Sequence, residues 1–146
     1  MRDNPSQPKP VSVLPHVLRL LDPAGDRGVL LATRCRRCGV TDLGVRRYCV
    51  NCTETDVRIL ELPSEGTLVN YTVVYRAGSG WEGGVPYVLG VAENPEGVRV
   101  TTEVVDCNAD QVRLGMPVQL TMRVEAKDSS SNPVVVYKWT PSRQSK

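Results

Sequence analysis

Apolar and polar residues alternate along the second half of the chain, from about residue 56 to residue 141. The alternating stretches are rich in Val, Thr, Tyr and Leu, and Gly, Pro, Asn or Asp separates them, which is typical of strands joined by turns. The pattern predicts strands over 56–63, 66–76, 85–94, 97–107, 117–126 and 133–141. Between the fourth and fifth of these, one helical turn is expected to begin at Asn108 and to end at Gly115.

Strands of this number and length, with one short helix before the last hairpin, are typical of a small Greek-key barrel of the OB type. A β-sandwich is the alternative, because the strand count fits both architectures. Phenylalanine is absent, so Val, Leu and Tyr must fill the core of either fold. We therefore expect a mainly β protein with a five-stranded OB barrel over residues 59–141 and a C-terminal tail over 142–146.

The N-terminal part has a different composition. Residues 1–12 are rich in Pro, Ser, Asn and Gln, which predicts a flexible arm. Residues 14–21, LPHVLRLL, are predicted to form one or two helical turns, which the turn-forming stretch DPAGDRG ends. Residues 28–35, GVLLATRC, then predict a short strand. An arm with a short N-terminal helix is thus expected over residues 1–27.

The bulk composition is that of an ordinary globular chain. Of its 146 residues, 40% are hydrophobic and 23% are charged, and the net charge is +2. A charge this small does not by itself indicate a nucleic-acid partner. No apolar run approaches the ~20 residues that cross a bilayer, so no membrane contact is expected, and the N-terminus lacks the pattern of a signal peptide. We expect a cytoplasmic protein, in which cysteines stay reduced.

Four of the five cysteines lie in the stretch RCRRCGVTDLGVRRYCVNC. Ten residues separate the two CxxC pairs, Cys35-x2-Cys38 and Cys49-x2-Cys52. Two such pairs supply four thiolates for one tetrahedral zinc ion, and Gly39 allows the chain to turn sharply after the first pair. Four sulfur ligands leave no open coordination position, so one structural Zn2+ per chain is expected rather than a catalytic one. A rubredoxin-like iron and a pair of disulfides are the alternatives.

Two features are candidate contacts for a ligand or partner. Six arginines and three acidic residues lie between residues 34 and 58, a local excess of +3 in which Arg46 and Arg47 are the candidates; a solvated charged surface is the alternative. The glycine-rich stretch GSGWEGG, 78–84, lacks the GK[ST] of a phosphate loop. It is either a mobile hairpin loop or a loop that closes over a ligand or partner with Trp81 as its anchor.

No catalytic constellation is evident. Cys107 lies at the end of a predicted strand and the sole histidine, His16, lies in the N-terminal segment, so no Cys–His pair can be argued. Cys107 is expected in the core or at a strand edge. Tyr71 and Tyr75 share one face of their predicted strand and are expected in the core, with a stacking platform for single-stranded nucleic acid as the alternative.

The cysteine module, followed by EGTLVNYTVVY, VPYVLGVAE, LGMPVQLTMRV and YKWTP, resembles a known family. Its members are small proteins that join a rubredoxin-like zinc ribbon to an OB fold and are encoded beside acyl-CoA enzymes. The resemblance covers roughly residues 28–141, with the ribbon over 28–58. The family's ribbon pattern, C-x2-C-G-x3-F-P-P-R-x2-C-P-x-C, is matched at the four cysteines, Gly39 and Arg46. The sequence departs from it at Leu43-Gly44-Val45, in place of Phe-Pro-Pro, and at Val50, in place of proline.

The resemblance implies a non-catalytic, zinc-binding accessory subunit of a thiolase-type or hydratase-type enzyme that acts on CoA thioesters. The small subunit of benzoylsuccinyl-CoA thiolase is an example of such a subunit. The resemblance also suggests that the arginines face the phosphates of CoA, the CoA part of the partner's substrate, or acids on the partner. A nucleic-acid-binding module is the alternative, since a ribbon joined to an OB fold also occurs there, although the modest charge disfavours it. An electron-transfer iron protein is a third hypothesis.

Overall fold

The structure of the protein is a computed structural model that describes residues 8–81 and 83–142. These residues form strands and one turn of 3-10 helix, η1 (Ala109–Gln111). The strands are β1 (Val11–Ser12), β2 (Leu18–Leu20), β3 (Gly28–Cys35), β4 (Thr41–Leu43), β5 (Val57–Glu61), β6 (Glu65–Val74), β7 (Tyr87–Glu93), β8 (Arg99–Val104), β9 (Pro117–Lys127) and β10 (Pro133–Pro141). Within the described ranges, no helix is long and apolar enough to cross a membrane.

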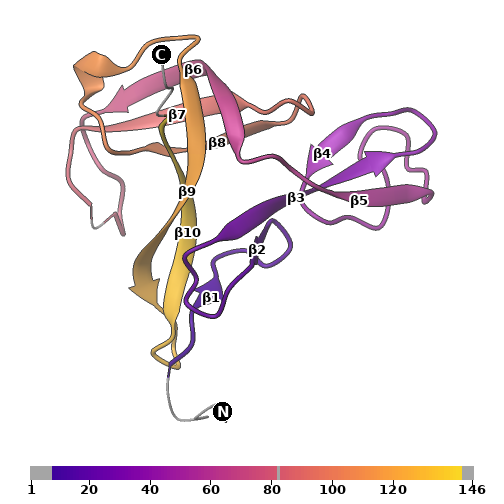
Figure 1. The fold of residues 1–146 in the computed structure, drawn as a ribbon, viewed down its shortest axis with the longest axis horizontal. Helices are drawn as coiled ribbons and strands as arrows, with labels where there is room; N and C mark the ends of the chain where they lie inside the picture. The colour runs from indigo at the N-terminus through magenta and orange to yellow at the C-terminus, as the bar shows by residue number, and fades with distance from the viewer. Residues whose placement is uncertain (1–7, 82, 143–146) are drawn as a thin grey trace. The chain divides into compact units, whose positions relative to one another are not determined.

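The chain forms two compact units, whose strands are labelled in Figure 1. One unit contains the residues up to Glu61 together with Met122–Tyr137, which are the connected ends of β9 and β10. The other contains Leu62–Thr121 and the residues from Lys138 onward. The expected arm over 1–12 lies partly, and the expected tail over 142–146 lies mostly, outside the described residues.

The first unit is organised around β3, the strand that the sequence predicts over 28–35. β2 pairs with the first half of β3, while β4 and β5 pair with its second half, and all three run antiparallel to it. Leu30, Leu31 and Ala32 of β3 are buried, as a strand with neighbours on both edges requires. In the same unit, β1 runs parallel to β10 and pairs Val11 with Val134. The last residue of β3 is Cys35, so this strand connects the apolar core of the unit to the first cysteine of the CxxC segment.

The predicted helical turns over 14–21 are wrong. The chain makes one tight turn there, in which Leu14 O accepts the N–H groups of Val17 and Leu18, and then continues as β2. Leu18 pairs with Leu30 of β3 and is fully buried. A helix this short is marginal on its own, whereas the edge of β3 offers ready hydrogen-bonding partners. Pairing with β3 therefore decides the conformation of this segment.

Five strands form a closed barrel, which confirms the OB-type architecture over the sandwich. The second unit contains β6, β7 and β8 whole, together with the parts of β9 up to Thr121 and of β10 from Lys138. The barrel strands follow the order β10-β8-β7-β6-β9, and β9 pairs with β10 to close the ring. β6 pairs with β7 along most of its length, with an irregularity between Leu68 and Asn70, and with β9 near its start. The β8–β10 pairing is parallel and joins Val104 to Trp139. Because the ring is closed, its strands satisfy one another's backbone groups.

Among the described residues, Trp139 on β10 is the largest fully buried side chain. Its indole Nε1 donates to the carbonyl of Val100 at 3.1 Å, so the one polar atom of the ring is satisfied inside the core. Gly66 leaves room for the ring, since a Cβ there would lie 3.3 Å from Trp139 Cη2. Gly90 is more confined, because its Cβ would lie 2.6 Å from Val104 Cγ2. The core of a barrel without phenylalanine is thus built around one tryptophan and small or branched side chains.

The strands predicted from the alternating pattern are present in the structure. β9 and β10 begin at the predicted residues 117 and 133, and the other strand ends differ by only a few residues. The predicted helical turn is a single turn of 3-10 helix, η1, directly after Asn108. Gly115, expected to stop it, has a left-handed φ of 87° shortly after its end. Local sequence signals were therefore sufficient for this part of the chain.

Candidate metal centre

The first CxxC pair forms a tight turn at the end of β3, here called the first knuckle. The backbone N–H groups of Arg37 and Cys38 donate to Sγ of Cys35 at 3.3 and 3.4 Å. Gly39 follows with a left-handed φ of 80°, and its N–H donates to the Cys35 carbonyl at 3.0 Å. A Cβ at Gly39 would have no atom within 4 Å, so glycine is favoured there by backbone conformation rather than by space. The predicted sharp turn is confirmed.

The second CxxC pair repeats this geometry fourteen residues later and is called the second knuckle. The N–H groups of Asn51 and Cys52 donate to Sγ of Cys49 at 3.3 and 3.4 Å. The N–H of Thr53, like that of the glycine in the first knuckle, donates to the carbonyl of the first cysteine, here at 2.9 Å. Thr53 also has a left-handed φ, 62°. The two turns are therefore equivalent, residue for residue, at an offset of fourteen.

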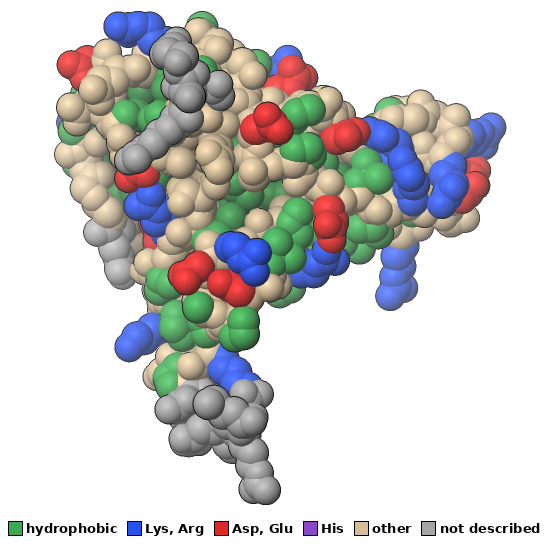
Figure 2. Space-filling view, viewed as in Figure 1, with side chains coloured by type: hydrophobic (Ala, Val, Ile, Leu, Met, Phe, Trp, Pro, Cys, Tyr) green, Lys and Arg blue, Asp and Glu red, His purple; other side chains and the backbone are tan. Residues whose placement is uncertain are grey.

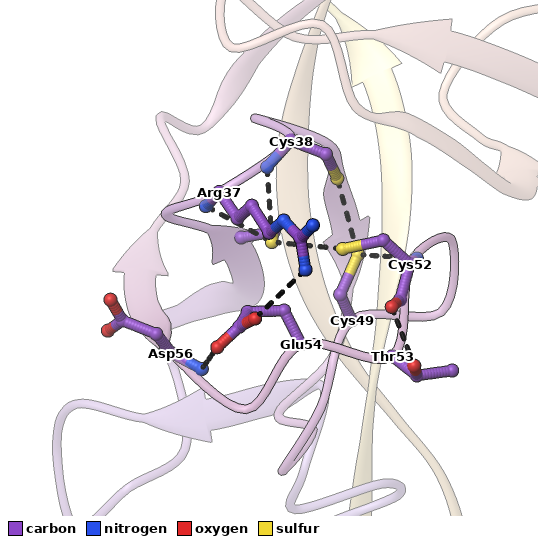
Figure 3. A network of polar contacts seen from close by, with 8 residues as sticks. Arg37, Cys38, Cys49, Cys52, Thr53, Glu54 and Asp56 are labelled. Carbon is purple, nitrogen blue, oxygen red and sulfur yellow. Dashed lines mark hydrogen bonds and ion pairs between the residues drawn. The ribbon is translucent and has the colours of Figure 1, made fainter.

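The two knuckles bring their four sulfur atoms together (Figure 3), all within 4.8 Å of one another. Cys35 Sγ lies 3.6 Å from Cys52 Sγ, and Cys38 Sγ lies 3.5 Å from Cys49 Sγ. Four sulfurs bound to zinc at the usual ~2.3 Å would be about 3.8 Å apart, which is close to these separations. No disulfide joins the five cysteines, all of which lie in the described part of the chain. The four cysteines could hold a metal ion, and their geometry fits a tetrahedral set of sulfur ligands.

The thiols of this cluster differ as acids. A hydrogen bond from the backbone N–H of Val40 lowers the pKa of Cys38 to about 6, and the side chain of Asn51 acts in the same direction. The backbone N–H of Glu54 also favours the thiolate of Cys52, but desolvation and the neighbouring sulfurs outweigh it and raise the pKa of Cys52 to about 12. Sulfurs this close cannot all be negative without a cation among them. Without a metal, one sulfur is therefore a thiolate while another keeps its proton.

Arginines surround the cluster, and Figure 2 shows Lys and Arg side chains gathered over the part of the first unit that holds β4 and β5. Each of the three acids between residues 34 and 58 pairs with an arginine: Asp56 with Arg36 at 3.2 Å, Glu54 with Arg37 at 3.5 Å, and Asp42 with Arg46. Exposed pairs of this kind contribute only about 0–1 kcal/mol each. The Arg37–Glu54 pair matters more for the arrangement of the site than for its stability, because it joins the first knuckle to the second (Figure 3).

The two arginines singled out by the sequence lie in different environments. Arg46 pairs with Asp42, and its backbone N–H donates to Thr33 Oγ1 at 2.9 Å. Thr33 is buried, and its hydroxyl in turn donates to the carbonyl of Gly44 at 2.7 Å. Arg46 is thus part of the hydrogen bonding that shapes the hairpin between the knuckles. Arg47 is exposed and has no hydrogen bond or ion pair with another described residue.

Trp81, the third candidate contact, lies in the loop between β6 and β7 of the barrel unit. Its ring stacks on Tyr87, with centroids 4.1 Å apart and planes 20° apart. Its Nε1 donates to the carbonyl of Gly84 at 3.3 Å. A Cβ at Gly83 would lie 2.9 Å from the indole ring, so only glycine fits there without displacing it. The exposure that the sequence suggested for this tryptophan is therefore limited by its own barrel.

The sequence also predicts the burial of two tyrosines and of the fifth cysteine. Tyr75 is 71% exposed, so its placement in the core is wrong, while Tyr71 is half-buried. Cys107 is half-buried just beyond β8, where burial and the charge of Asp106 raise the pKa of its thiol. A raised pKa makes this cysteine a poor nucleophile at neutral pH.

A DUF35 domain-containing scaffold protein of Methanocaldococcus jannaschii is 32% identical over 113 residues, which are 77% of this chain and 79% of that protein. This chain belongs to the family of DUF35 domain-containing scaffold proteins. A second member, from Methanothermobacter thermautotrophicus, is 27% identical over 109 residues, 74% of this chain and 81% of that protein.

The fold of this DUF35 protein also has counterparts. The family described as the ChsH2 C-terminal OB-fold domain matches residues 60–123, which lie in and around the barrel. A chain of the solved Ltp2-ChsH2(DUF35) aldolase has the same fold, with a TM-score of 0.59 and 24% identity, over 77% of this chain and 84% of that one. The family expected from the sequence is therefore confirmed.

Proposed function

We propose that this DUF35 protein is a non-catalytic, zinc-binding scaffold subunit that docks on an acyl-CoA enzyme of the thiolase type in the cytoplasm. It would support the partner's structure and its binding of acyl-CoA. The observation that carries the proposal is the cluster of four cysteine sulfurs in a chain whose relatives are named scaffold proteins. Four sulfur ligands leave no position open for a substrate or a water molecule. The metal would hold the chain rather than perform chemistry.

The burial of the cysteine segment supports a structural role for one Zn2+ per chain. Between residues 36 and 58, Gly44 and Cys49 are the residues that are buried. Burial of so little apolar surface does not offset the conformational entropy that the segment loses on folding. The binding of structural zinc supplies roughly 10–16 kcal/mol in zinc-finger peptides. The two knuckles would therefore be folded by the ion that they bind.

The charge of the same segment argues against a nucleic-acid partner. Between residues 34 and 58, which include all four cysteines, arginines exceed acids by three. Four thiolates with one divalent ion carry −2, so most of this excess is offset once the metal is bound. A net charge of +1 is small for binding a polyphosphate chain, in which affinity grows with the number of cations that contact phosphates. A protein surface, or the few phosphates of one CoA, is a better match.

Three side chains are proposed as contacts to the partner or to CoA. Arg47 is exposed and unpaired among the described residues, so its guanidinium is available for a phosphate or a carboxylate. Arg46 is engaged by Asp42 and would contribute mainly by shaping the hairpin that presents Arg47. Trp81 presents the part of its ring that Tyr87 leaves uncovered, and partly covered aromatic rings are frequent anchors at interfaces.

The partner is proposed to be thiolase-type or hydratase-type, and related assemblies support an enzyme partner in general. The solved neighbour is named as an Ltp2-ChsH2(DUF35) aldolase, so a DUF35 chain occurs there in an enzyme assembly. A scaffold subunit should lack turnover alone and should be recovered with its enzyme in a fixed ratio.

Affinity purification of the tagged full-length chain from its native host, followed by mass spectrometry and zinc analysis, tests the proposal. We expect one thiolase-fold or hydratase subunit in stoichiometric amount and one zinc per chain. The Arg47→Ala variant is the matched test of the arginine contact, with Arg58→Ala, another exposed arginine of the same segment, as its control. Recovery of nucleic acid or of nucleic-acid-processing proteins instead would overturn the scaffold assignment.

A further inference from the structure

The two knuckles have equivalent backbone hydrogen bonds but differ in one side chain that contacts the opposite knuckle. Arg37 and Asn51 occupy the same place, two residues after the first cysteine of each knuckle, and both donate their backbone N–H to that cysteine. Their side chains cross to the opposite knuckle. Arg37 pairs with the carboxylate of Glu54, whereas Nδ2 of Asn51 donates to Sγ of Cys38 at 3.7 Å. The side chain of Asn51 therefore contacts a sulfur of the cluster directly, whereas the side chain of Arg37 contacts a carboxylate.

The sulfur that Asn51 contacts belongs to the one exposed cysteine of the cluster. Cys35 and Cys49 are buried and each accept two backbone N–H groups, and Cys52 is half-buried, whereas Cys38 is exposed. An exposed thiolate is where water, chelators and electrophiles reach a closed sulfur site first. A donor placed there draws charge from the thiolate and fixes its direction, as groups outside the ligand set commonly do in metal sites.

We propose that Asn51 is a positioning residue of the metal centre. Its carboxamide holds the exposed Cys38 thiolate across the two knuckles, so that the ion is retained more tightly and released more slowly. This inference rests on the proposed binding of a metal by the four cysteines. It assigns a function to a side chain that is not a ligand and that the CxxC spacing does not identify.

The test uses the full-length protein loaded with Co2+, whose thiolate-to-metal charge-transfer band reports on the electron density of its sulfur ligands. Removal of the donor in Asn51→Ala is expected to shift this band to lower energy, and to weaken metal binding and speed transfer to a chelator about 10-fold. Asn51→Asp keeps the size of the side chain but places a negative acceptor beside the thiolate. It is expected to lose more affinity than Asn51→Ala.

Arg37→Ala is the matched control, because it removes the crossing side chain at the equivalent position and leaves the sulfurs untouched. It should keep the band of the parent and its release rate within about 2-fold, since it loses only an exposed ion pair. Equal band positions and release rates in Asn51→Ala and the parent would overturn the inference. Equal changes in Asn51→Ala and Arg37→Ala would also overturn it, by showing a general loosening of the knuckles. A parent protein that binds neither Co2+ nor Zn2+ would instead refute the metal centre itself.

Discussion

Thr53 has the same left-handed backbone conformation as Gly39, its counterpart fourteen residues earlier, with φ of 62° and 80°. Each donates its N–H to the carbonyl of the cysteine four residues before it. Glycine adopts this conformation without cost, whereas a β-branched residue pays about 1–2 kcal/mol. Thr53 is therefore the strained member of the pair, and the geometry of the second CxxC turn persists in spite of it.

Relief of this strain should stabilise the loaded protein. Thr53→Asn is expected to raise the metal affinity, or the free energy of unfolding of the knuckles, by about 0.5 kcal/mol, because asparagine tolerates the left-handed region better. Gly39→Ala should have the opposite effect, a loss of about 1–2 kcal/mol, although space is available for the methyl group. Metal competition titrations of the two variants check both signs. Equal affinities would show that the backbone conformation of this turn is not limiting.

The strained threonine illustrates how far the sequence could be used to predict the site. The spacing of the cysteines was sufficient to predict the four sulfurs, because each CxxC turn is a local structure. The contacts between the knuckles, Asn51 with Cys38 and Arg37 with Glu54, join residues whose proximity depends on how the two turns face each other. The only trace of them in the sequence is the fourteen-residue offset between the cysteine pairs. No residue type in the pattern marks Asn51 in advance.

The strands of the barrel were predictable because they too depend on local sequence signals. Period-two alternation bounded by turn residues is a local signal, and it gave the strands of the barrel. Leu18–Leu20 is a strand rather than the predicted helix. Three residues are too few to show a helical or a strand periodicity, and pairing with β3 sets their conformation. Tyr75 follows the alternation of its strand but lies beyond the end of β6, where no neighbour covers it. In both cases the result depends on residues distant in the sequence: β3 pairs with Leu18–Leu20, and no such residue in the described part of the chain covers Tyr75.

Loss of one metal ligand should separate the two parts of the protein. Cys35→Ser is expected to lose zinc and unfold the two knuckles, because Cys35 is buried and the segment has little core of its own. The barrel should remain folded. Trp81 and Trp139 both belong to the barrel unit, so tryptophan fluorescence follows the barrel while zinc analysis and circular dichroism follow the knuckles. Cys107→Ser, outside the cluster, is the control and should keep its zinc. If Cys35→Ser matched the parent in all three measurements, a structural metal would be ruled out.

Acid should release the metal. Thiolate ligands must lose their protons before they bind, so protons compete with the ion and affinity falls as the pH falls. The pKa of Cys38 is lowered to about 6, so this ligand is a thiolate at neutral pH and becomes protonated only below about pH 6. Cys52, whose pKa is raised to about 12, must give up a proton when the metal binds at any physiological pH. Zinc occupancy measured from pH 8 to pH 4 at fixed total zinc should be full at neutral pH and decline below about pH 6. Occupancy that is independent of pH over this range would contradict thiolate ligation.

The tryptophan of the β6–β7 loop should matter for binding more than for folding. Trp81→Ala removes a half-buried loop ring that stacks on Tyr87 and whose centroid lies 5.8 Å from Lys138 Nζ. It should weaken recovery of the partner enzyme more than it lowers the melting temperature. Gly83→Ala leaves the tryptophan in the chain but displaces its ring, because the added methyl would lie 2.9 Å from it. Pull-down of the partner with both variants is the measurement. Unchanged recovery in both would reduce this loop to a connection between strands.

Lys138 and Glu103 form a nearly buried ion pair inside the barrel unit, with Nζ 2.5 Å from Oε1 and side-chain exposures of 6% and 20%. Removal of the cation alone, in Lys138→Met, leaves a carboxylate with little access to water and should cost about 2 kcal/mol of unfolding free energy. The double variant Lys138→Met with Glu103→Leu removes both charges, and it should recover most of this loss because an apolar pair can replace a buried ion pair. Urea unfolding followed by tryptophan fluorescence, which reports on the barrel, gives the coupling energy from the double-mutant cycle. A double variant as unstable as the sum of the single ones would show that the two charges stabilise the barrel independently rather than as a pair.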